Sequence, residues 1–413
     1  MNLGLITLCA LALAVILSCT TSLNVGLLAI ALAWFIGVYL GHMPVREITA
    51  GFPVDLFLTL AGVTLLFSQA RVNGTLERVA HLAVRLCRGR IGIVPIMYFI
   101  LASALATAGP GNIATTGLLA PMAMTTATGM GISPFLMAIM VGNGANSGSL
   151  SPLAPTGLIV NPLMARIGLP GLGLQTWFFN FIAHAIVAFT AYMIFGGWKL
   201  IRRSERFKGI KEKPPELHRR HILTIALIGM LVVGVLVLNI NIGMAAFAAA
   251  VILGLLGAAD QEEAIREMPW GSILMVCGVT VLISLLEKTS GMALFTNLLT
   301  RISSRGTIIP FLAMIVGTIS AYSSTSGVVL PAFLPLAPGL SENLGGGITK
   351  ALAMTMNVSG HLVDVSPLST IGALCIASIP AGPKSRRLFN QLLAWGLSMT
   401  VVAAVLCWLL FGL

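Results

Sequence analysis

The sequence predicts an all-α polytopic membrane protein that is built as an inverted repeat. Each of the two repeats consists of five transmembrane helices plus one re-entrant hairpin, with broken helices. Three observations predict this fold. Only 9% of the 413 residues are charged while 57% are hydrophobic, a composition too apolar for a water-soluble surface. The apolar runs are continuous, as in spanning helices, and do not alternate as the strands of a membrane β-barrel do. The second half of the chain also repeats sequence features of the first.

The distribution of basic residues predicts how the chain is oriented in a cell membrane. The net charge is +11, but aromatic residues are not interleaved with the basic ones, so a nucleic-acid partner is not expected. With the segment 198–221 in the cytoplasm, 18 of the 24 Lys and Arg residues fall inside, as the positive-inside rule requires. Both termini then face outward. The six basic residues left outside are Arg46, Arg166, Lys288, Arg301, Arg305 and Lys350.

The apolar runs and their interruptions define the expected elements of each repeat. In the first repeat, 1–197, we expect spans near 3–20, 23–41, 54–70 and 176–197, an interfacial amphipathic helix at 75–88, a hairpin at 91–128 and a broken helix at 132–165. The basic segment 198–221 is the predicted cytoplasmic linker. In the second repeat, 222–413, we expect an interfacial stretch at 289–305, a hairpin at 308–343 and a broken helix at 348–379.

Short motifs recur between the two halves in nearly constant register, at offsets of 215 to 217 residues. Five spans per repeat is an odd number, so the second repeat is inserted in the opposite orientation, which predicts an inverted duplication. The recurring segments are Asn24-Val25-Gly26 with Asn241-Ile242-Gly243, Gly62-Val63-Thr64 with Gly278-Val279-Thr280, Gly74 with Gly291, Pro95 with Pro310, Ser151-Pro152-Leu153 with Ser366-Pro367-Leu368, and Gly157 with Gly372.

Four interruptions rich in Gly, Ser, Thr, Asn and Pro are the candidate functional regions: 108–113, 142–157, 323–327 and 357–372. Free backbone groups inside a membrane are tolerated where they line a cavity or are buried in protein. Helix N-termini suit an anion such as a carboxylate, and unwound carbonyls and hydroxyls suit a hard cation such as Na⁺. The alternative is that these small residues only pack helices against one another.

Two sets of motifs are similar to known carriers. The segment Gly111-Asn112-Ile113-Ala114-Thr115-Thr116, followed by Pro121, resembles the first hairpin motif, Ser-Asn-Thr-Ala-Thr-Thr, of the divalent-anion:Na⁺ symporters in the ion-transporter superfamily. The segment Phe52-Pro53-Val54-Asp55-Leu56-Phe57, with Gly62-Val63-Thr64 and Asn73-Gly74-Thr75-Leu76, resembles the N-terminal region of MatC-type dicarboxylate carriers. This chain departs from the hairpin motif at Gly111 and Ile113, where the symporters have Ser and Thr, and its second hairpin has no Asn.

The resemblance implies which residues hold the ligands. In the family, the hairpin Asn and neighbouring hydroxyls hold a substrate carboxylate and Na⁺. The substrate-binding residues implied in this chain are Asn112, Thr115, Ser151, Thr325, Ser326, Ser366 and Thr370. The expected ion-binding residues are Asn112, Asn146, Ser147, Ser324 and Asp364.

Asp364 stands out among the thirteen acidic residues, because it alone lies well inside a break at membrane depth. An ionisable group at this depth indicates an ion pathway. It is either a fixed anionic partner of Na⁺ or a proton carrier, and the neighbouring Asn146, Ser147 and Thr370 oxygens favour Na⁺. The structural alternatives are a solvated residue at the mouth of a cavity and a partner of His361.

These observations predict a secondary active transporter that carries out Na⁺-coupled symport of a small dicarboxylate of the malonate/succinate class. The resemblance further implies a homodimer and an elevator-like mechanism. No cofactor other than the coupling ion is expected. The alternatives are an H⁺-coupled or uniporting organic-anion carrier of the same fold and, more remotely, a channel or a membrane enzyme. No catalytic motif supports an enzyme.

Overall fold

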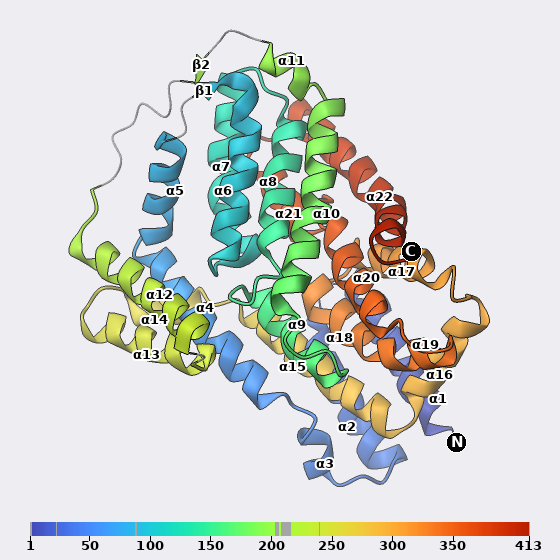
Figure 1. The fold of residues 1–413 in the computed structure, drawn as a ribbon. Helices are drawn as coiled ribbons and strands as arrows, with labels where there is room; N and C mark the ends of the chain where they lie inside the picture. Colours follow the sequence, from blue (N-terminus) through green and yellow to red (C-terminus); the bar gives the residue numbers. More distant parts are fainter. Residues whose placement is uncertain are drawn as a thin grey trace.

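The computed structural model describes residues 2–21, 23–86, 89–202, 206–207, 216–238 and 240–412. Within these ranges the regular elements are helices, apart from one antiparallel pair of two-residue strands, β1 (Gly89–Arg90) and β2 (Arg206–Phe207) (Figure 1). The protein is therefore all-helical in character, as predicted. Part of the predicted basic linker, at 203–205 and 208–215, lies outside the described residues.

The predicted spans of residues 1–197 appear as helices with closely similar bounds. The spans near 3–20, 54–70 and 176–197 correspond to α1, α4 and α10, and the amphipathic stretch at 75–88 corresponds to α5. The elements are α1 (Leu3–Thr20), α2 (Val25–Phe35), the π-helix η1 (Ile36–Leu40), α3 (Val45–Thr49), α4 (Val54–Val72), α5 (Thr75–Leu86), the 3₁₀ helix η2 (Ile91–Ile93), α6 (Val94–Thr107), α7 (Gly111–Gly129), α8 (Pro134–Gly148), α9 (Pro155–Arg166), α10 (Gly173–Ile194) and α11 (Gly197–Ile201).

The C-terminal part of the chain follows a similar order of long, short and interrupted helices. Its elements are α12 (Arg219–Leu238), α13 (Ile242–Leu255), α14 (Gln261–Arg266), α15 (Trp270–Lys288), α16 (Gly291–Arg301), α17 (Ile308–Ser320), the π-helix η3 (Thr325–Val329), α18 (Leu330–Phe333), the 3₁₀ helix η4 (Leu334–Leu336), α19 (Ala337–Asn343), α20 (Thr349–Leu362), α21 (Thr370–Ala377) and α22 (Pro383–Phe411).

Interruptions occur at all four predicted places, and each is narrower than the sequence indicates. The chain turns between α6 and α7 over Ala108–Pro110, and between α17 and η3 over residues 321–324, where the two helical segments are bent by 120°. Gly109 and Gly111 have φ values of +136° and +75°. A side chain is strained in this part of φ/ψ space, so the turn requires glycine at both positions.

The other two interruptions are matching loops. The loop between α8 and α9 contains Ser151, whose hydroxyl accepts a 3.2 Å hydrogen bond from the Leu153 N–H. The loop between α20 and α21 repeats this turn, because the Ser366 hydroxyl accepts a 3.3 Å hydrogen bond from the Leu368 N–H. Hydroxyls that bond locally to the backbone compete with helix formation. These serines therefore help to keep the two loops unwound.

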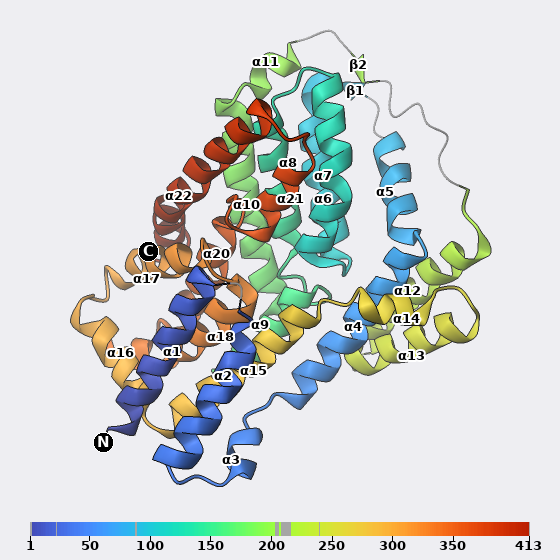
Figure 2. The ribbon, with the colours of Figure 1, turned by 180° about the vertical axis from the view of Figure 1, so that it is seen from behind.

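The long helices form two groups. In the first group α6, α7, α8 and α10 stand side by side, α20, α21 and α22 pack against them, and α17 packs against α20 and α22 (Figures 1 and 2). In the second group α4 packs against α13, α2 packs against α15, and α1 packs against α2 and α16. Helices α4 and α15 cross obliquely beneath the first group in both views.

Glycines allow the closest helix crossings in the second group. A side chain at Gly26 in α2 would collide with the backbone of α15, and one at Gly243 in α13 would collide with the backbone of α4. Gly278 and Gly62 face these two crossings from α15 and α4. Small residues let helix backbones approach closely within a membrane. The two crossings pair motifs that recur between the halves of the chain.

Several helices are apolar and long enough to cross a membrane. Among the described residues, α4, α10, α15 and α22 meet both conditions, and the bent segment from α17 to α19 makes five if it is counted as one span. Shorter apolar helices of 10 to 17 residues include Leu3–Leu17, Val25–Leu40, Ile91–Thr107 and Ile242–Leu255. The chain is thus a polytopic membrane protein in its composition and helices, and the total of ten spans stays a prediction.

Candidate substrate and ion site

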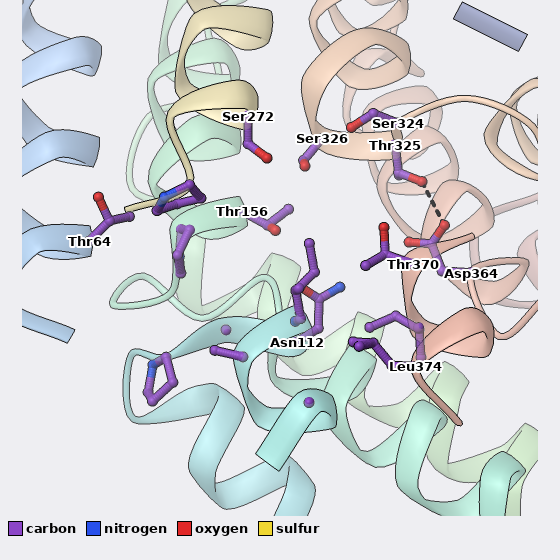
Figure 3. Close-up of a pocket in the computed structure, with 18 of the residues that line it drawn as sticks. Thr64, Asn112, Thr156, Ser272, Ser324, Thr325, Ser326, Asp364, Thr370 and Leu374 are labelled. Carbon is purple, nitrogen blue, oxygen red and sulfur yellow. Dashed lines mark hydrogen bonds between the residues drawn. The ribbon is translucent and has the colours of Figure 1, made fainter. Parts of the chain in front are cut away.

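A cavity of about 880 Å³ lies where the two helix groups meet. Helices α4 and α15 provide one side, and α7 and α21 provide the opposite side. Side chains from α9, from the residues preceding η3 and from the loop before α21 also line it (Figure 3). The cavity is therefore bordered by segments that follow all four interruptions of the chain.

The starts of four helical segments line this one cavity. They are Gly111–Asn112 of α7, Pro155–Thr156 of α9, Thr325–Ser326 of η3 and Thr370–Ile371 of α21. The first N–H groups of a helix have no partner within the helix, and the helix dipole places partial positive charge there. Converging helix starts can therefore hold an anion without a Lys or Arg side chain.

Asn112 is held at the cavity by the buried residues behind it. Its Nδ2 donates to Oδ1 of Asn146 at 2.8 Å, and its Oδ1 accepts from the Ile113 N–H at 3.0 Å. Asn146 is fully buried, and its Nδ2 donates to the His361 carbonyl at 3.4 Å. The backbone carbonyl of Asn146 accepts from Nδ2 of Asn180 at 2.8 Å. Asn146 thus positions Asn112 and does not itself line the cavity.

Asp364 and three neighbouring hydroxyls gather at one part of the cavity (Figure 3). The Thr325 hydroxyl donates to Oδ1 of Asp364 at 2.9 Å. The Asp364 backbone is tied into the loop, because the Ser369 hydroxyl donates to its carbonyl. Ser324 lines the same region, and its hydroxyl accepts from the Gly327 N–H at 3.0 Å. A carboxylate with hydroxyl oxygens nearby provides the oxygen ligands that hard cations such as Na⁺ prefer.

Six of the residues singled out from the sequence line the cavity: Asn112, Ser324, Thr325, Ser326, Asp364 and Thr370. The other five are buried and do not line it: Thr115, Asn146, Ser147, Ser151 and Ser366. The Ser147 hydroxyl lies 2.8 Å from the Ser103 hydroxyl and 2.7 Å from the Gly144 carbonyl, and its one proton is shared between these two partners. Ser151 donates to the Thr107 carbonyl at 2.8 Å, which joins its loop to the end of α6.

Sequence reasoning did not single out several hydroxyl residues of the lining. Among them are Thr64 of α4, Thr156 of α9 and Ser272 of α15 (Figure 3). Thr64 belongs to one of the motifs that recur between the halves, so the repeat was a signal for it. Ser272 lies in an apolar stretch with no local signal, and only the packing of α15 places it at the cavity.

The charged residues of the lining are unevenly placed. Arg71 is the one Lys or Arg that lines the cavity within the described ranges, and it pairs with Glu267 at 3.4 Å. Their side chains are 63% and 46% exposed, so this pair lies at the solvent-accessible edge. Exposed pairs of this kind contribute little free energy. The deeper part of the cavity offers an anion only neutral donors.

The protein thus combines apolar helices that are long enough to cross a membrane with an internal cavity lined by both polar and apolar side chains. Residues 1–149 match the family model described as the dicarboxylate carrier protein MatC N-terminus. The chain is also similar to two proteins named "uncharacterized transporter", from the CDC 1551 / Oshkosh and H37Rv strains of Mycobacterium tuberculosis. Each is 23% identical over 389 residues, covering 86% of this chain and 85% of the relative.

These similarities confirm the resemblance predicted from the N-terminal motifs, and they point to a transporter and not to an enzyme. The matched region, 1–149, includes α1 to α8 and therefore the first hairpin segment with Asn112.

Proposed function

We propose that this protein is a secondary active transporter that couples uptake of a small dicarboxylate, of the malonate/succinate class, to Na⁺. The observation that carries the proposal is the convergence of four helix starts, with Asn112 and several hydroxyls, on one cavity. The N–H and O–H donors of these groups could bind the two carboxylates of a short dicarboxylate, one at each end. The match to a dicarboxylate carrier model supports the same substrate class.

The coupling ion follows from charge balance in the cavity. A dianion bound near the carboxylate of Asp364 would be repelled at low dielectric unless a cation bound with it. The carboxylate of Asp364, with the Thr325, Ser324 and Thr370 hydroxyls nearby, supplies oxygen ligands suited to Na⁺. The alternative is that Asp364 itself takes up a proton, which would couple transport to H⁺.

The architecture proposed for this function is an inverted repeat, with residues 1–197 and 222–413 as the two halves and 198–221 as a cytoplasmic linker. The equivalent glycine crossings of α2 with α15 and of α13 with α4 support it, as do the matching Ser151 and Ser366 loops. We further propose that the protein is a homodimer and that the first helix group moves past the second in an elevator-like manner, carrying the cavity with it.

Uptake by purified protein in proteoliposomes tests the proposal. Radiolabelled malonate and succinate should accumulate against a gradient when Na⁺ is imposed outside, and a pH gradient alone should drive no accumulation. Equilibration without accumulation would indicate a channel or uniporter. Accumulation driven by pH alone would replace Na⁺ with H⁺ as the coupling ion.

Substitution of Asp364 tests whether this residue couples transport to Na⁺. Asp364→Asn should abolish Na⁺-driven accumulation while substrate binding persists, because the variant loses the negative ligand of Na⁺. Asp55→Asn is the matched control, since Asp55 is exposed at the start of α4 and lies outside the cavity. Wild-type Na⁺ dependence in the Asp364→Asn variant would remove Asp364 from the coupling site.

A further inference from the structure

The cavity has an apolar wall directly beside its carboxylate-binding groups. Ile113 follows Asn112 at the start of α7, lines the cavity and is 48% exposed. Leu368, just before the start of α21, also lines the cavity and is 45% exposed. Each of these exposed apolar side chains stands within two residues of a polar lining residue, Asn112 or Thr370.

The apolar wall continues along α7 and α21, which face each other on this side of the cavity. Gly117 lies one turn beyond Ile113 on the same face of α7. A Cβ atom added at Gly117 would lie 4.0 Å from Cδ1 of Leu374 in α21. Leu374 lies one turn beyond Thr370, and both line the cavity (Figure 3). In both α7 and α21, the polar groups at the helix start are therefore followed one turn later by an apolar surface.

A short unbranched dicarboxylate would leave this surface in contact with water. Malonate and succinate have one and two methylene groups between their carboxylates, and both carboxylates are drawn to the helix starts. The cavity, at about 880 Å³, has room for a larger carbon skeleton. Each methylene group that such a skeleton buries against Ile113, Leu368 and Leu374 would tighten binding about fourfold.

From this geometry we infer that the preferred substrate is a dicarboxylate with an alkyl-substituted or branched carbon skeleton, whose apolar part lies on the wall formed by Ile113, Leu368 and Leu374. The inference rests on the proposed function and narrows its substrate class. It assigns Ile113 a specificity role at a position where the related hairpin motif has a hydroxyl residue.

Equilibrium binding to the full-length protein in lipid nanodiscs, with saturating Na⁺, tests the inference. Malonate, ethylmalonate and butylmalonate serve as probes because their two carboxylates are identical. We expect butylmalonate to bind at least about tenfold more tightly than malonate, with ethylmalonate between them. Equal binding, or tightest binding of malonate, would overturn the inference while leaving the proposed function intact. Failure of all three probes and of succinate to bind would overturn both.

Two variants connect the preference to the wall. Ile113→Thr should reduce the butylmalonate preference several-fold and leave malonate affinity nearly unchanged. Ile100→Thr is the matched control, since Ile100 is 59% exposed on α6 and does not line the cavity. Leu368→Thr repeats the test on the second helix start if Ile113→Thr lowers the melting temperature. A preference that survives both wall variants would overturn the inference.

Discussion

In the proposed site, Asn112 serves both the ligand and the scaffold. Its amide group is bonded to Asn146 behind it, and its backbone N–H belongs to the start of α7. An amide fixed in this way presents its remaining N–H without losing further side-chain entropy on binding. In the proposed site, it would serve as a rigid donor to an anion without a Lys or Arg buried in the membrane.

Removal of this amide should weaken substrate binding. Asn112→Ala deletes a hydrogen bond to a charged ligand, which is worth about 1.5–3 kcal/mol, so dicarboxylate affinity should fall roughly 10- to 150-fold. Titration of the purified variant with succinate measures the change. Asn297→Ala is the control, because the Asn297 side chain accepts a 2.9 Å hydrogen bond from Asn343 and does not line the cavity. Unchanged affinity in Asn112→Ala would exclude Asn112 from the site.

At the scale of elements, the two unwound loops depend on the helices that follow them. Gly157 in α9 lies against the carbonyl of Ser151, and Gly372 in α21 lies against the carbonyl of Ser366. A side chain at either position would collide with the loop backbone. These two glycines thus let each loop fold back over the first turn of the next helix, which places both helix starts at the cavity.

A methyl group at these positions should therefore disturb the fold and the site together. Gly157→Ala and Gly372→Ala should each destabilise the protein by about 1–3 kcal/mol, as overpacking does, and weaken dicarboxylate binding. Thermal melting in detergent and ligand titration measure the two effects. Gly129→Ala is the control, because no atom lies within 4 Å of a Cβ built there. Wild-type melting of both loop variants would show that these contacts are unimportant.

For the whole molecule, the orientation in the membrane follows from charge. Positive residues resist transfer to the outside during insertion, so the basic segment should remain in the cytoplasm. Residue Glu216 is exposed at the end of this segment, and Arg46 is exposed on the predicted outer side.

Cysteine labelling of whole cells tests this orientation. In a background without the native cysteines, Arg46→Cys should react readily with a membrane-impermeant thiol reagent, and Glu216→Cys should react only after the cells are permeabilised. Labelling of Glu216→Cys in intact cells would reverse the proposed topology.

The helical class, the membrane character and the four interruptions could all be predicted from the sequence. These features arise from local causes, because long apolar runs span the bilayer and Gly, Pro, Ser and Asn interrupt helices wherever they cluster. The exact bounds of the interruptions were harder to predict. The break expected at 142–157 is helical as far as Gly148, since packing among buried neighbours compensates for the low helix propensity of Gly, Asn and Ser.

Only the tertiary structure decided which polar residues share the cavity. Ser151 and Ser366 belong to conspicuous motifs but bond to their own loops, whereas Ser272 has no local signal and lines the cavity. Asn146 supports Asn112 from behind, across 34 positions of sequence. The physical reason is that the sequence determines where a helix breaks, while the direction a side chain then faces depends on how helices distant in the chain pack around it.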